Sequence, residues 1–247
     1  MTVLSIILVV IILLVLFTLS LKLKIFDLKG SVAALILGAW VAFMGSILWL
    51  ILMVFFALSS YMATRAFFTK KKEMNLQEGR SGERRTTNIV FAGVIGAVIA
   101  FVFFLSSRID PGEFPYFELF AISFASINAD TFASEIGSVD SRVYLITTLR
   151  KTRQGINGGV SITGIAASIL GGFLVGLVFV LLDFGYFSVI PALFITAMGV
   201  FGSTIDSILG ALYENAGKIN KGTVNFLATL ASVILSVVLI YLLPSLS

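Results

Sequence analysis

Two aspartates, Asp130 and Asp206, lie near the ends of long apolar runs in which charged side chains are otherwise rare. A carboxylate at membrane depth costs about 2.5–3.5 kcal/mol on insertion scales, so by default it marks a functional site. Each aspartate stands in a segment rich in small and polar residues, at 128–137 and at 202–210. Two carboxylates in such similar surroundings predict one shared site.

The composition limits the chemistry that is open to this site. The chain of 247 residues contains neither Cys nor His. This excludes disulfides, thiolate or imidazole metal sites, and Ser-His or Cys-His catalytic pairs. Carboxylates, hydroxyls, amides, Lys and Arg remain. Such a set suits phosphate groups and Mg²⁺, which prefers hard oxygen ligands.

The elements that must position these residues are apolar helices. Hydrophobic residues make up 58% of the chain and charged residues only 12%, which indicates a polytopic membrane protein. We predict an all-α transmembrane bundle, a single integral membrane domain over residues 1–247 with a basic cytoplasmic loop at 64–87. The apolar runs lie near 2–21, 31–45, 46–63, 88–106, 116–136, 158–182, 187–211 and 223–244. They predict about eight spans, with Gly45 as a tight reversal, or about seven if 31–63 is read differently.

The basic residues predict how the bundle is oriented. Arg108 falls on one side of the predicted membrane, and the other Lys and Arg residues fall on the opposite side. The positive-inside rule makes that basic side cytoplasmic and places both termini outside. The sequence pI near 9.4 follows from this bias, so it favours anionic lipid heads and phosphates over nucleic acid as partners.

Two predicted spans carry small residues at every fourth position. These residues are Gly30, Ala34, Gly38 and Ala42 in one span, and Gly164, Ser168, Gly172 and Gly176 in the other. A spacing of four places them on one ridge, which lets helix backbones approach closely. We read both ridges as packing surfaces.

Helix starts on the cytoplasmic side offer places for phosphate groups. Free backbone N–H groups and the positive end of the helix dipole meet there, so an anion is favoured. The best such start is Asn157-Gly158-Gly159-Val160-Ser161, where we predict a helix from Gly158 onward. The basic residues near such starts are Lys29, Arg84, Arg85, Lys151, Arg153 and Lys221. The alternative is that these segments are ordinary helix caps beside the charges of the cytoplasmic loops.

The two aspartates lie at the other kind of helix end. Helix C-termini carry partial negative charge, so a carboxylate there needs a Mg²⁺ ion or a Lys or Arg partner. Helical spacing places Ser123, Ser126, Asp130 and Ser134 on one stripe, with Asn128, Thr131 and Glu135 beside it. A second stripe consists of Ser203, Asp206, Ser207 and Gly210. Facing stripes would form an oxygen-rich cleft just below the membrane surface. The alternative is a structural salt bridge or a hydrogen-bonded helix pair.

Several of these segments resemble motifs of one membrane family. The string Ala129-Asp130-Thr131-Phe132-Ala133-Ser134-Glu135-Ile136-Gly137 is similar to its ADT-x-[AS]-SE-x-G motif. Leu145-Ile146-Thr147-Thr148 through Gly155-Ile156-Asn157-Gly158-Gly159-Val160-Ser161 resembles LITT…G-x-NGG-V-[ST]. Gly202-Ser203-Thr204-Ile205-Asp206-Ser207-Ile208-Leu209-Gly210-Ala211 resembles GS-x-x-DS-x-LGA, and Val224-Asn225-Phe226 matches a later VNF. The chain thus resembles the DUF92 family, which includes the transmembrane protein 19 group and the plant and cyanobacterial phytyl-phosphate kinases.

The chain departs from the family pattern in two places. It reads Phe91-Ala92-Gly93 where relatives have Ala-Asn-Gly. It reads Ile219-Asn220-Lys221-Gly222 where they have Asp-Asn-Asn.

The resemblance implies a membrane-bound prenyl-phosphate kinase. Such an enzyme transfers a phosphoryl group from a nucleoside triphosphate, CTP or ATP, to a prenyl monophosphate of the phytyl or geranylgeranyl type. On this reading the catalytic and Mg²⁺-binding residues are Asp130, Glu135 and Asp206. Those that bind nucleotide phosphate are Lys29, Arg84, Arg85, Arg153, Asn157, Gly158, Gly159 and Ser161. The supporting residues are Asn128, Thr131, Ser134, Ser203, Ser207 and Asn225.

The expected setting follows from the same resemblance. The protein would be a multi-pass protein of the cell membrane, with its active site on the cytoplasmic face. Its partners would be the prenyl phosphate, the nucleotide and membrane lipids. Whether it forms a homo-oligomer is left open. A CTP-dependent polyprenol kinase or a lipid cytidylyltransferase is an alternative; the cytidylyltransferase would release pyrophosphate. A transporter of an ion or an anionic lipid is another, although transporters tend to bind their cargo near the bilayer midplane.

Overall fold

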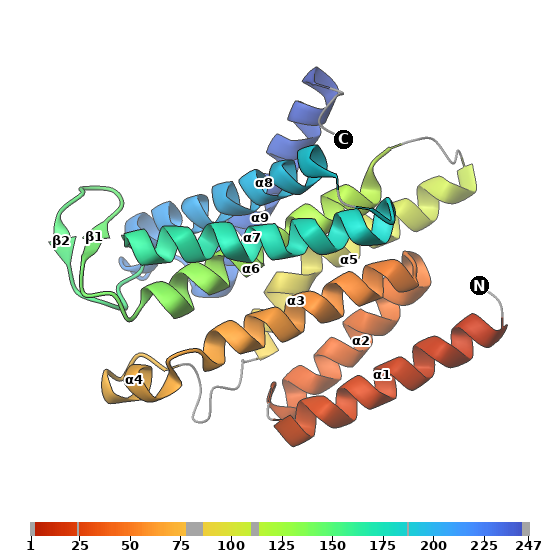
Figure 1. Cartoon of the computed structure of the whole chain (residues 1–247), viewed down its shortest axis with the longest axis horizontal. Coiled ribbons are helices and arrows are strands. Elements are labelled where there is room, and N and C mark those ends of the chain that lie inside the picture. Colours follow the sequence, from red (N-terminus) through yellow and green to blue (C-terminus); the bar gives the residue numbers. More distant parts are fainter. Residues whose placement is uncertain (1–2, 24, 78–85, 110–113, 187, 244–247) are drawn as a thin grey trace.

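The chain folds into a bundle of long helices with one small sheet (Figure 1). A computed structural model describes residues 3–23, 25–77, 86–109, 114–186 and 188–243. The helices are α1 (Val3–Leu23), α2 (Leu28–Met44), α3 (Ile47–Arg65), α4 (Phe68–Glu73), α5 (Thr86–Ile109), α6 (Tyr116–Gly137), α7 (Ile162–Asp183), α8 (Val189–Leu209) and α9 (Lys221–Leu242). The strands are β1 (Val143–Leu145), β2 (Lys151–Thr152) and β3 (Gly159–Val160), and a π-helical turn, η1 (Gly210–Glu214), continues α8.

The long helices run back and forth between two ends of the molecule. In Figure 1, α4 and the strands lie at the left end, and α1 begins at the right end. Lys22 and Arg65 stand in the last turns of α1 and α3, which point toward α4 and the strands. Arg108 stands in the last turn of α5, which runs the other way. The alternation therefore separates Arg108 from these basic residues, as the sequence predicted.

Several helices could cross a membrane. Among the described residues, 5 helices are long and apolar enough: α1, α3, α7, α8 together with η1, and α9. The helix α2 and the part Gly93–Ile109 of α5 are apolar but shorter. The chain reverses between α2 and α3 at Gly45 and Ser46, where a tight reversal was predicted. The Ser46 hydroxyl caps α3 by accepting a hydrogen bond from the Leu48 N–H at 3.2 Å.

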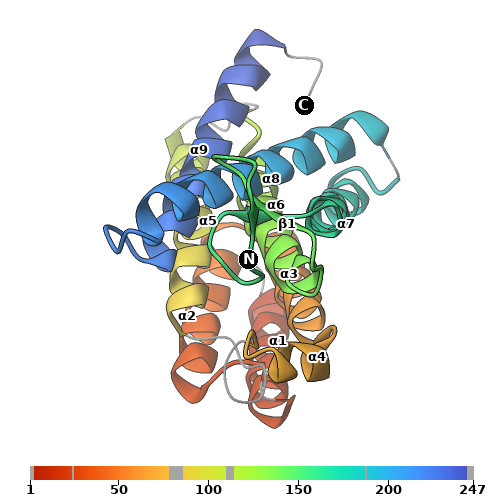
Figure 2. The same cartoon turned by 90° about the vertical axis from the view of Figure 1, so that its left-hand side faces the viewer.

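The helix α6 lies near the middle of the bundle (Figure 2). Its residues from Glu118 to Ala129 are all buried, and it contacts α3, α5, α7, α8 and α9. Because protein surrounds this helix, its polar side chains can find protein partners at depth. Asn128 shows this: its Nδ2 donates to the Gly171 carbonyl of α7 at 2.8 Å. Its Oδ1 accepts hydrogen bonds from the Ser59 and Ser60 hydroxyls of α3 at 3.1 and 2.9 Å.

Glycines bring the backbones of α6, α7 and α8 together. A Cβ atom on Gly176 would lie 2.7 Å from the Ala192 carbonyl oxygen, so α7 and α8 touch there through their backbones. A Cβ atom on Gly202 of α8 would lie 1.9 Å from the Ser126 Oγ of α6. Such contacts leave no room for a larger side chain. The three helices therefore form a closely packed support for the residues at their ends.

The segment between α6 and α7 differs from the prediction of an all-α fold. We expected a helix from Gly158, but α7 begins only at Ile162 and three short strands precede it. The strand β1 pairs antiparallel with β2 on one side and with β3 on the other. Gly158 has a φ of +76°, a left-handed conformation that breaks a helix. The glycines therefore make a turn into β3 and do not open the helix.

Candidate functional site

Three helices and one turn line a cavity of about 410 Å³ at the sheet end of the bundle. Each helix presents residues spaced three and four apart, which share one helical face. These faces are Asp130, Ala133, Ser134 and Gly137 of α6, Ser161, Gly164, Ile165 and Ser168 at the start of α7, and Val200, Ser203, Thr204 and Ser207 of α8. The cavity is also lined by the turn Gly155–Val160 and by Ser138, Val143, Ile146, Asp206 and Lys221. The volume lies within the range of small-molecule sites, about 300–1,000 Å³.

Lys221 joins the two aspartates in the wall of this cavity. Its Nζ lies 2.5 Å from the Oδ1 of Asp206 and 3.3 Å from the Oδ2 of Asp130. The side chains of Asp206 and Asp130 are only 6% and 15% exposed, whereas that of Lys221 is 41% exposed. The structure thus brings the two aspartates together, as their similar segments predicted. A lysine supplies the positive charge that two carboxylates at helix C-termini need.

The turn before α7 is seated against the end of α8. A Cβ atom on Gly158 would lie 2.5 Å from the Ala211 Cβ and 2.6 Å from the Ser207 carbonyl oxygen. Space and the positive φ therefore both require glycine at this position. Asn215 follows η1 directly, and its Nδ2 donates a hydrogen bond to the Asn157 carbonyl at 2.9 Å. These contacts place the Asn157-Gly158-Gly159 segment in the same cavity as the aspartates.

The first turn of α7 faces this cavity. The Ser161 hydroxyl caps the helix by accepting a hydrogen bond from the Gly164 N–H at 3.0 Å, and both residues line the cavity. A helix start combines free N–H groups with the positive end of the dipole, so it attracts an anion. The start of α7 therefore adds an anion-attracting element to a cavity that also carries the carboxylates of Asp130 and Asp206.

Glu135 does not join the two aspartates. It forms an ion pair with the fully buried Lys71 of α4, whose ammonium also donates to the Thr64 carbonyl at 2.6 Å. The expected metal site of Asp130, Asp206 and Glu135 is therefore not formed. Among the described residues, no three of His, Cys, Asp or Glu cluster closely enough to hold a metal ion. The reason is helical geometry: five residues along a helix turn a side chain by about 140°. The pair instead fastens α4 to the end of α6.

The other predicted residues separate into two groups. Ser134, Ser203 and Ser207 line the cavity, and Asn225 lies beside both aspartates in a second, much smaller cavity. Asn128 and Thr131 are buried in the helix packing and do not line the main cavity. Lys29 and Arg153 are exposed and do not line it either. Arg84 and Arg85 lie outside the described residues.

Sequence reasoning missed three contributors to this site. The sequence marks Lys221 only as a basic residue at a helix start, and Ser168 only as part of a packing ridge. Glu214 was not noted at all; it lies in η1, where it interacts electrostatically with Lys221 and Asp130. Its Oε2 and the Ser168 Oγ are buried with no hydrogen-bond partner among the described residues. The need for a cation at two helix ends was the available signal for Lys221. The π-helical turn, a feature often found at functional sites, has no comparable signal in the sequence.

The donor atoms of this site suit Mg²⁺. In the part of the chain that the structure describes, the Oδ2 of Asp206 and the Oδ1 of Asn225 are buried without a hydrogen-bond partner. Mg²⁺ is usually held by one or two carboxylates together with substrate phosphates, and Asp130 and Asp206 supply that number. Glu214 adds a further acidic side chain, which interacts electrostatically with Lys221 and Asp130. The residues therefore fit a divalent cation.

The loop that follows α6 is tied to the first turn of α7 through Asp140. Its carboxylate accepts hydrogen bonds from the Arg142 backbone N–H at 2.9 Å and from the Thr163 hydroxyl at 2.7 Å. These hydrogen bonds lower the pKa of Asp140 below its usual value of 3.8, and the bond from the Arg142 N–H has the largest effect. The carboxylate thus helps to fix the direction in which the chain enters the sheet and α7.

Comparisons with known proteins agree with this membrane architecture. Residues 11–237 match the model of a family described as integral membrane protein DUF92. An uncharacterised membrane protein of Methanocaldococcus jannaschii is 31% identical over 222 residues, which cover 88% of this chain and 87% of that protein. Protein PGR of Arabidopsis thaliana is 30% identical over 80% of this chain and 75% of its own length. The chloroplastic protein VTE6 of the same plant is 30% identical over 59% of this chain and 44% of its own length. No solved structure matches the chain.

Proposed function

Because the chain belongs to the DUF92 family of integral membrane proteins, we propose that it is a membrane-bound phosphotransferase that converts a prenyl monophosphate into the diphosphate. The observation that carries this proposal is the cavity in which Asp130, Asp206 and Lys221 face the anion-attracting start of α7. Resemblance to the phytyl-phosphate kinases of the family supports the acceptor, as does the partial similarity to protein VTE6.

The reaction needs two phosphate-bearing substrates to meet. An oxygen of the acceptor monophosphate attacks the γ-phosphorus of a nucleoside triphosphate. The bond between this phosphorus and the bridging oxygen to the β-phosphate breaks, and a nucleoside diphosphate leaves. The acceptor phosphate is largely ionised at neutral pH, since its second pKa is about 6, so no protein base has to remove a proton. The task of the protein is to position the substrates and to stabilise negative charge.

The residues of the cavity are suited to this task. The ammonium of Lys221 can stabilise negative charge on the phosphoryl group in flight, because it is the half-exposed member of the ion-paired cluster. The Asn157-Gly158-Gly159 turn and the N–H groups at the start of α7 can hold nucleotide phosphates. Mg²⁺ held by Asp130 and Asp206 would neutralise charge on the substrate phosphates.

The experiment that tests this proposal is a turnover assay in lipid nanodiscs. Purified protein is mixed with Mg²⁺, CTP or ATP, and phytyl or geranylgeranyl monophosphate, and lipid and nucleotide products are identified by mass spectrometry. We expect a prenyl diphosphate and a nucleoside diphosphate in equal amounts. Pyrophosphate together with a nucleotidyl lipid would identify a nucleotidyltransferase. Absence of any product with all nucleotide and lipid pairs would refute the proposal.

A further inference from the structure

The helices α7 and α8 form two sides of the cavity, and they close one end of it where they come into contact. Near their middle they touch through their backbones, because a Cβ atom on Gly172 would lie 3.1 Å from the Thr196 carbonyl oxygen. Toward the sheet, α7 instead packs on α6, where a Cβ atom on Gly137 would lie 2.8 Å from the Gly164 Cα. The cavity occupies the space that this leaves between α7 and α8. It is therefore a cleft that narrows from the aspartates toward the contact at Gly172.

The rim of this cleft lies on the outer surface of the bundle. Ile165 of α7 is 50% exposed although it lines the cavity, and Thr204 of α8 is exposed as well. The next turn of α7 carries the exposed Ile169, and α8 carries the exposed Leu193 nearer to its N-terminus. Apolar side chains of this kind on a membrane helix face the lipid. The cleft thus opens sideways, toward the hydrocarbon region.

The cleft changes in character along its length. Along α8, Asp206 lies nearer the sheet end and Val200 nearer the contact with α7, and along α7 the buried Ser168 lies nearer that contact than the rim residue Ile165. The Ser168 hydroxyl has no hydrogen-bond partner among the described residues. From Ser161 to Ser168 the helix rises about 10 Å. This arrangement matches a molecule with an anionic head and an aliphatic tail, of which only the first part is enclosed.

We infer that the cleft between α7 and α8 binds the phosphate-proximal part of the tail of a lipid phosphate, which enters sideways from the bilayer. The inference rests on the proposed function for the identity of the acceptor. Beyond the contact of Gly172 with Thr196 the tail has no enclosed path between these helices, so it lies in the surrounding lipid. The protein therefore selects for the shape of the first few carbons and not for total chain length.

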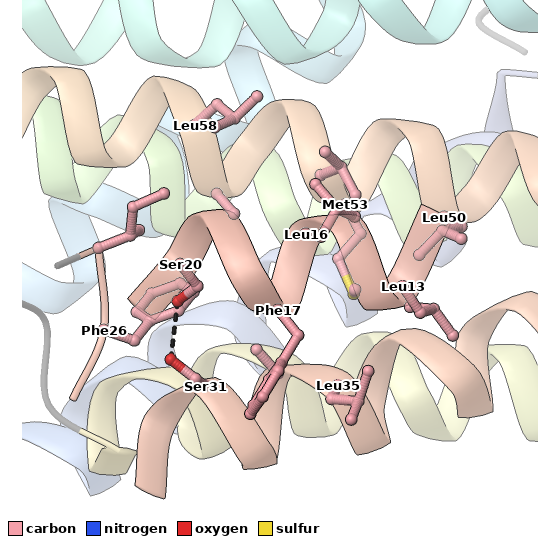
Figure 3. Close-up of a pocket in the computed structure, with 14 residues that line it drawn as sticks. Leu13, Leu16, Phe17, Ser20, Phe26, Ser31, Leu35, Leu50, Met53 and Leu58 are labelled. Atoms are coloured by element: carbon pink, nitrogen blue, oxygen red, sulfur yellow. Dashed lines mark hydrogen bonds between the residues drawn. The ribbon is translucent and has the colours of Figure 1, made fainter. Parts of the chain in front are cut away.

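A second cavity between α1, α2 and α3 is the competing place for a lipid (Figure 3). It measures about 80 Å³ and is lined almost entirely by apolar side chains such as Leu13, Phe17 and Met53. Its lining includes two serines, Ser20 and Ser31, whose hydroxyls bond to each other at 2.7 Å. No charged side chain is among its lining residues. A phosphate head would have no counter-charge there, so this cavity does not suit the acceptor.

Photolabelling tests the inference without requiring turnover. The probe is a geranylgeranyl monophosphate analogue with a diazirine on the first carbons, added to the full-length protein in nanodiscs without nucleotide. Mass spectrometry of peptides then locates the labelled residues. We expect labelling at 162–170 and 200–207, and little labelling with the matching alcohol, which lacks the phosphate. A second probe with the diazirine at the far end of the tail should label protein weakly, because that part lies in lipid.

Variants that fill the cleft sharpen the test. Ser168→Phe fills the inner end and Thr204→Trp narrows the rim, and each should lower labelling roughly tenfold or more. The control is Leu181→Phe, which adds bulk at an exposed position of α7 well beyond the contact at Gly172 and should leave labelling unchanged. Thr204→Trp lies on the surface, so it keeps the test valid if Ser168→Phe does not fold. Labelling of α1–α3, or labelling that the cleft variants leave unchanged, would overturn the inference. Labelling in the cleft without phosphoryl transfer would count against the proposed reaction alone.

Discussion

Replacement of Lys221 by Met should destabilise the protein by roughly 2–3 kcal/mol. The variant keeps the length of the side chain but removes the charge that lies 2.5 Å from Asp206 and 3.3 Å from Asp130. Removing one partner of a buried ion pair costs about 3–5 kcal/mol, whereas an exposed pair is worth about 0–1 kcal/mol. Asp206 is 6% exposed and Lys221 is 41% exposed, so the effect should lie between these limits.

The assay is reversible unfolding in detergent micelles, followed by circular dichroism. The matched control is Lys218→Met, because Lys218 is an exposed lysine in the turn just before α9 and should contribute less than about 0.5 kcal/mol. The double variant Lys221→Met with Asp206→Asn removes both charges of the shorter pair and should recover most of the lost stability. Equal stability of wild type and Lys221→Met would refute the view that Lys221 holds the two aspartates together.

The same variant reports on the divalent cation. Without the ammonium, Asp130 and Asp206 form an uncompensated negative pair, so Mg²⁺ should stabilise Lys221→Met more than wild type. A cation that binds only the folded state adds about 2.7 kcal/mol at a concentration one hundred times its Kd. Mg²⁺ that leaves the stability of Lys221→Met unchanged would show that these carboxylates do not form its site.

Three further changes test the packing and the loop that support the site. Gly202→Ala should destabilise the protein by about 1–3 kcal/mol, because its Cβ would lie 1.9 Å from the Ser126 Oγ, and Ser126→Gly should relieve this in unfolding measurements. Asn128→Ala should cost roughly 1–2 kcal/mol through the loss of three interhelical hydrogen bonds of about 0.6 kcal/mol each, yet kcat/KM of the folded protein should stay unchanged. Asp140 has a lowered pKa in the folded state, so its stabilising effect is present above pH 3.8 and is lost as the pH falls through the folded pKa. Asp140→Asn should therefore flatten the acid side of the profile of Tm against pH. A profile that this variant leaves unchanged would contradict the hydrogen-bonded geometry of Asp140.

The sequence predicted the helices and the meeting of the aspartates for physical reasons. Apolar runs of membrane length have few alternatives to helix, so each predicted run is found as a helix, although α2 is shorter than a typical span. Asp130 and Asp206 both stand near the ends of runs that finish on the same side, so helix alternation brings them to a similar depth. The cost of two buried carboxylates also predicted a compensating cation, which in the structure is Lys221.

Other features depend on rotation and turn geometry that composition does not reveal. Glu135 shares a polar segment with Asp130, but its rotation around α6 directs it to Lys71. The glycine at position 158 was read as a helix start, although its fit against Ala211 makes it a turn. Glu214 depends on a single π-helical turn, which no residue pattern announces. The surroundings of each of these three residues depend on how two elements are placed relative to each other. No local pattern in a single sequence gives that placement.

The most direct test of the central claim is phosphoryl transfer by Asp206→Asn. Wild type, Asp206→Asn and the control Asp183→Asn, which changes an aspartate at the opposite end of α7, are compared in nanodiscs with γ-labelled nucleotide and geranylgeranyl monophosphate. If Asp130, Asp206 and Lys221 form the transfer site, label appears in the lipid with wild type and Asp183→Asn. With Asp206→Asn, transfer should fall roughly a hundredfold or more, because the cations that stabilise transition-state charge lose one of the carboxylates that hold them. Undiminished transfer by Asp206→Asn would contradict the account.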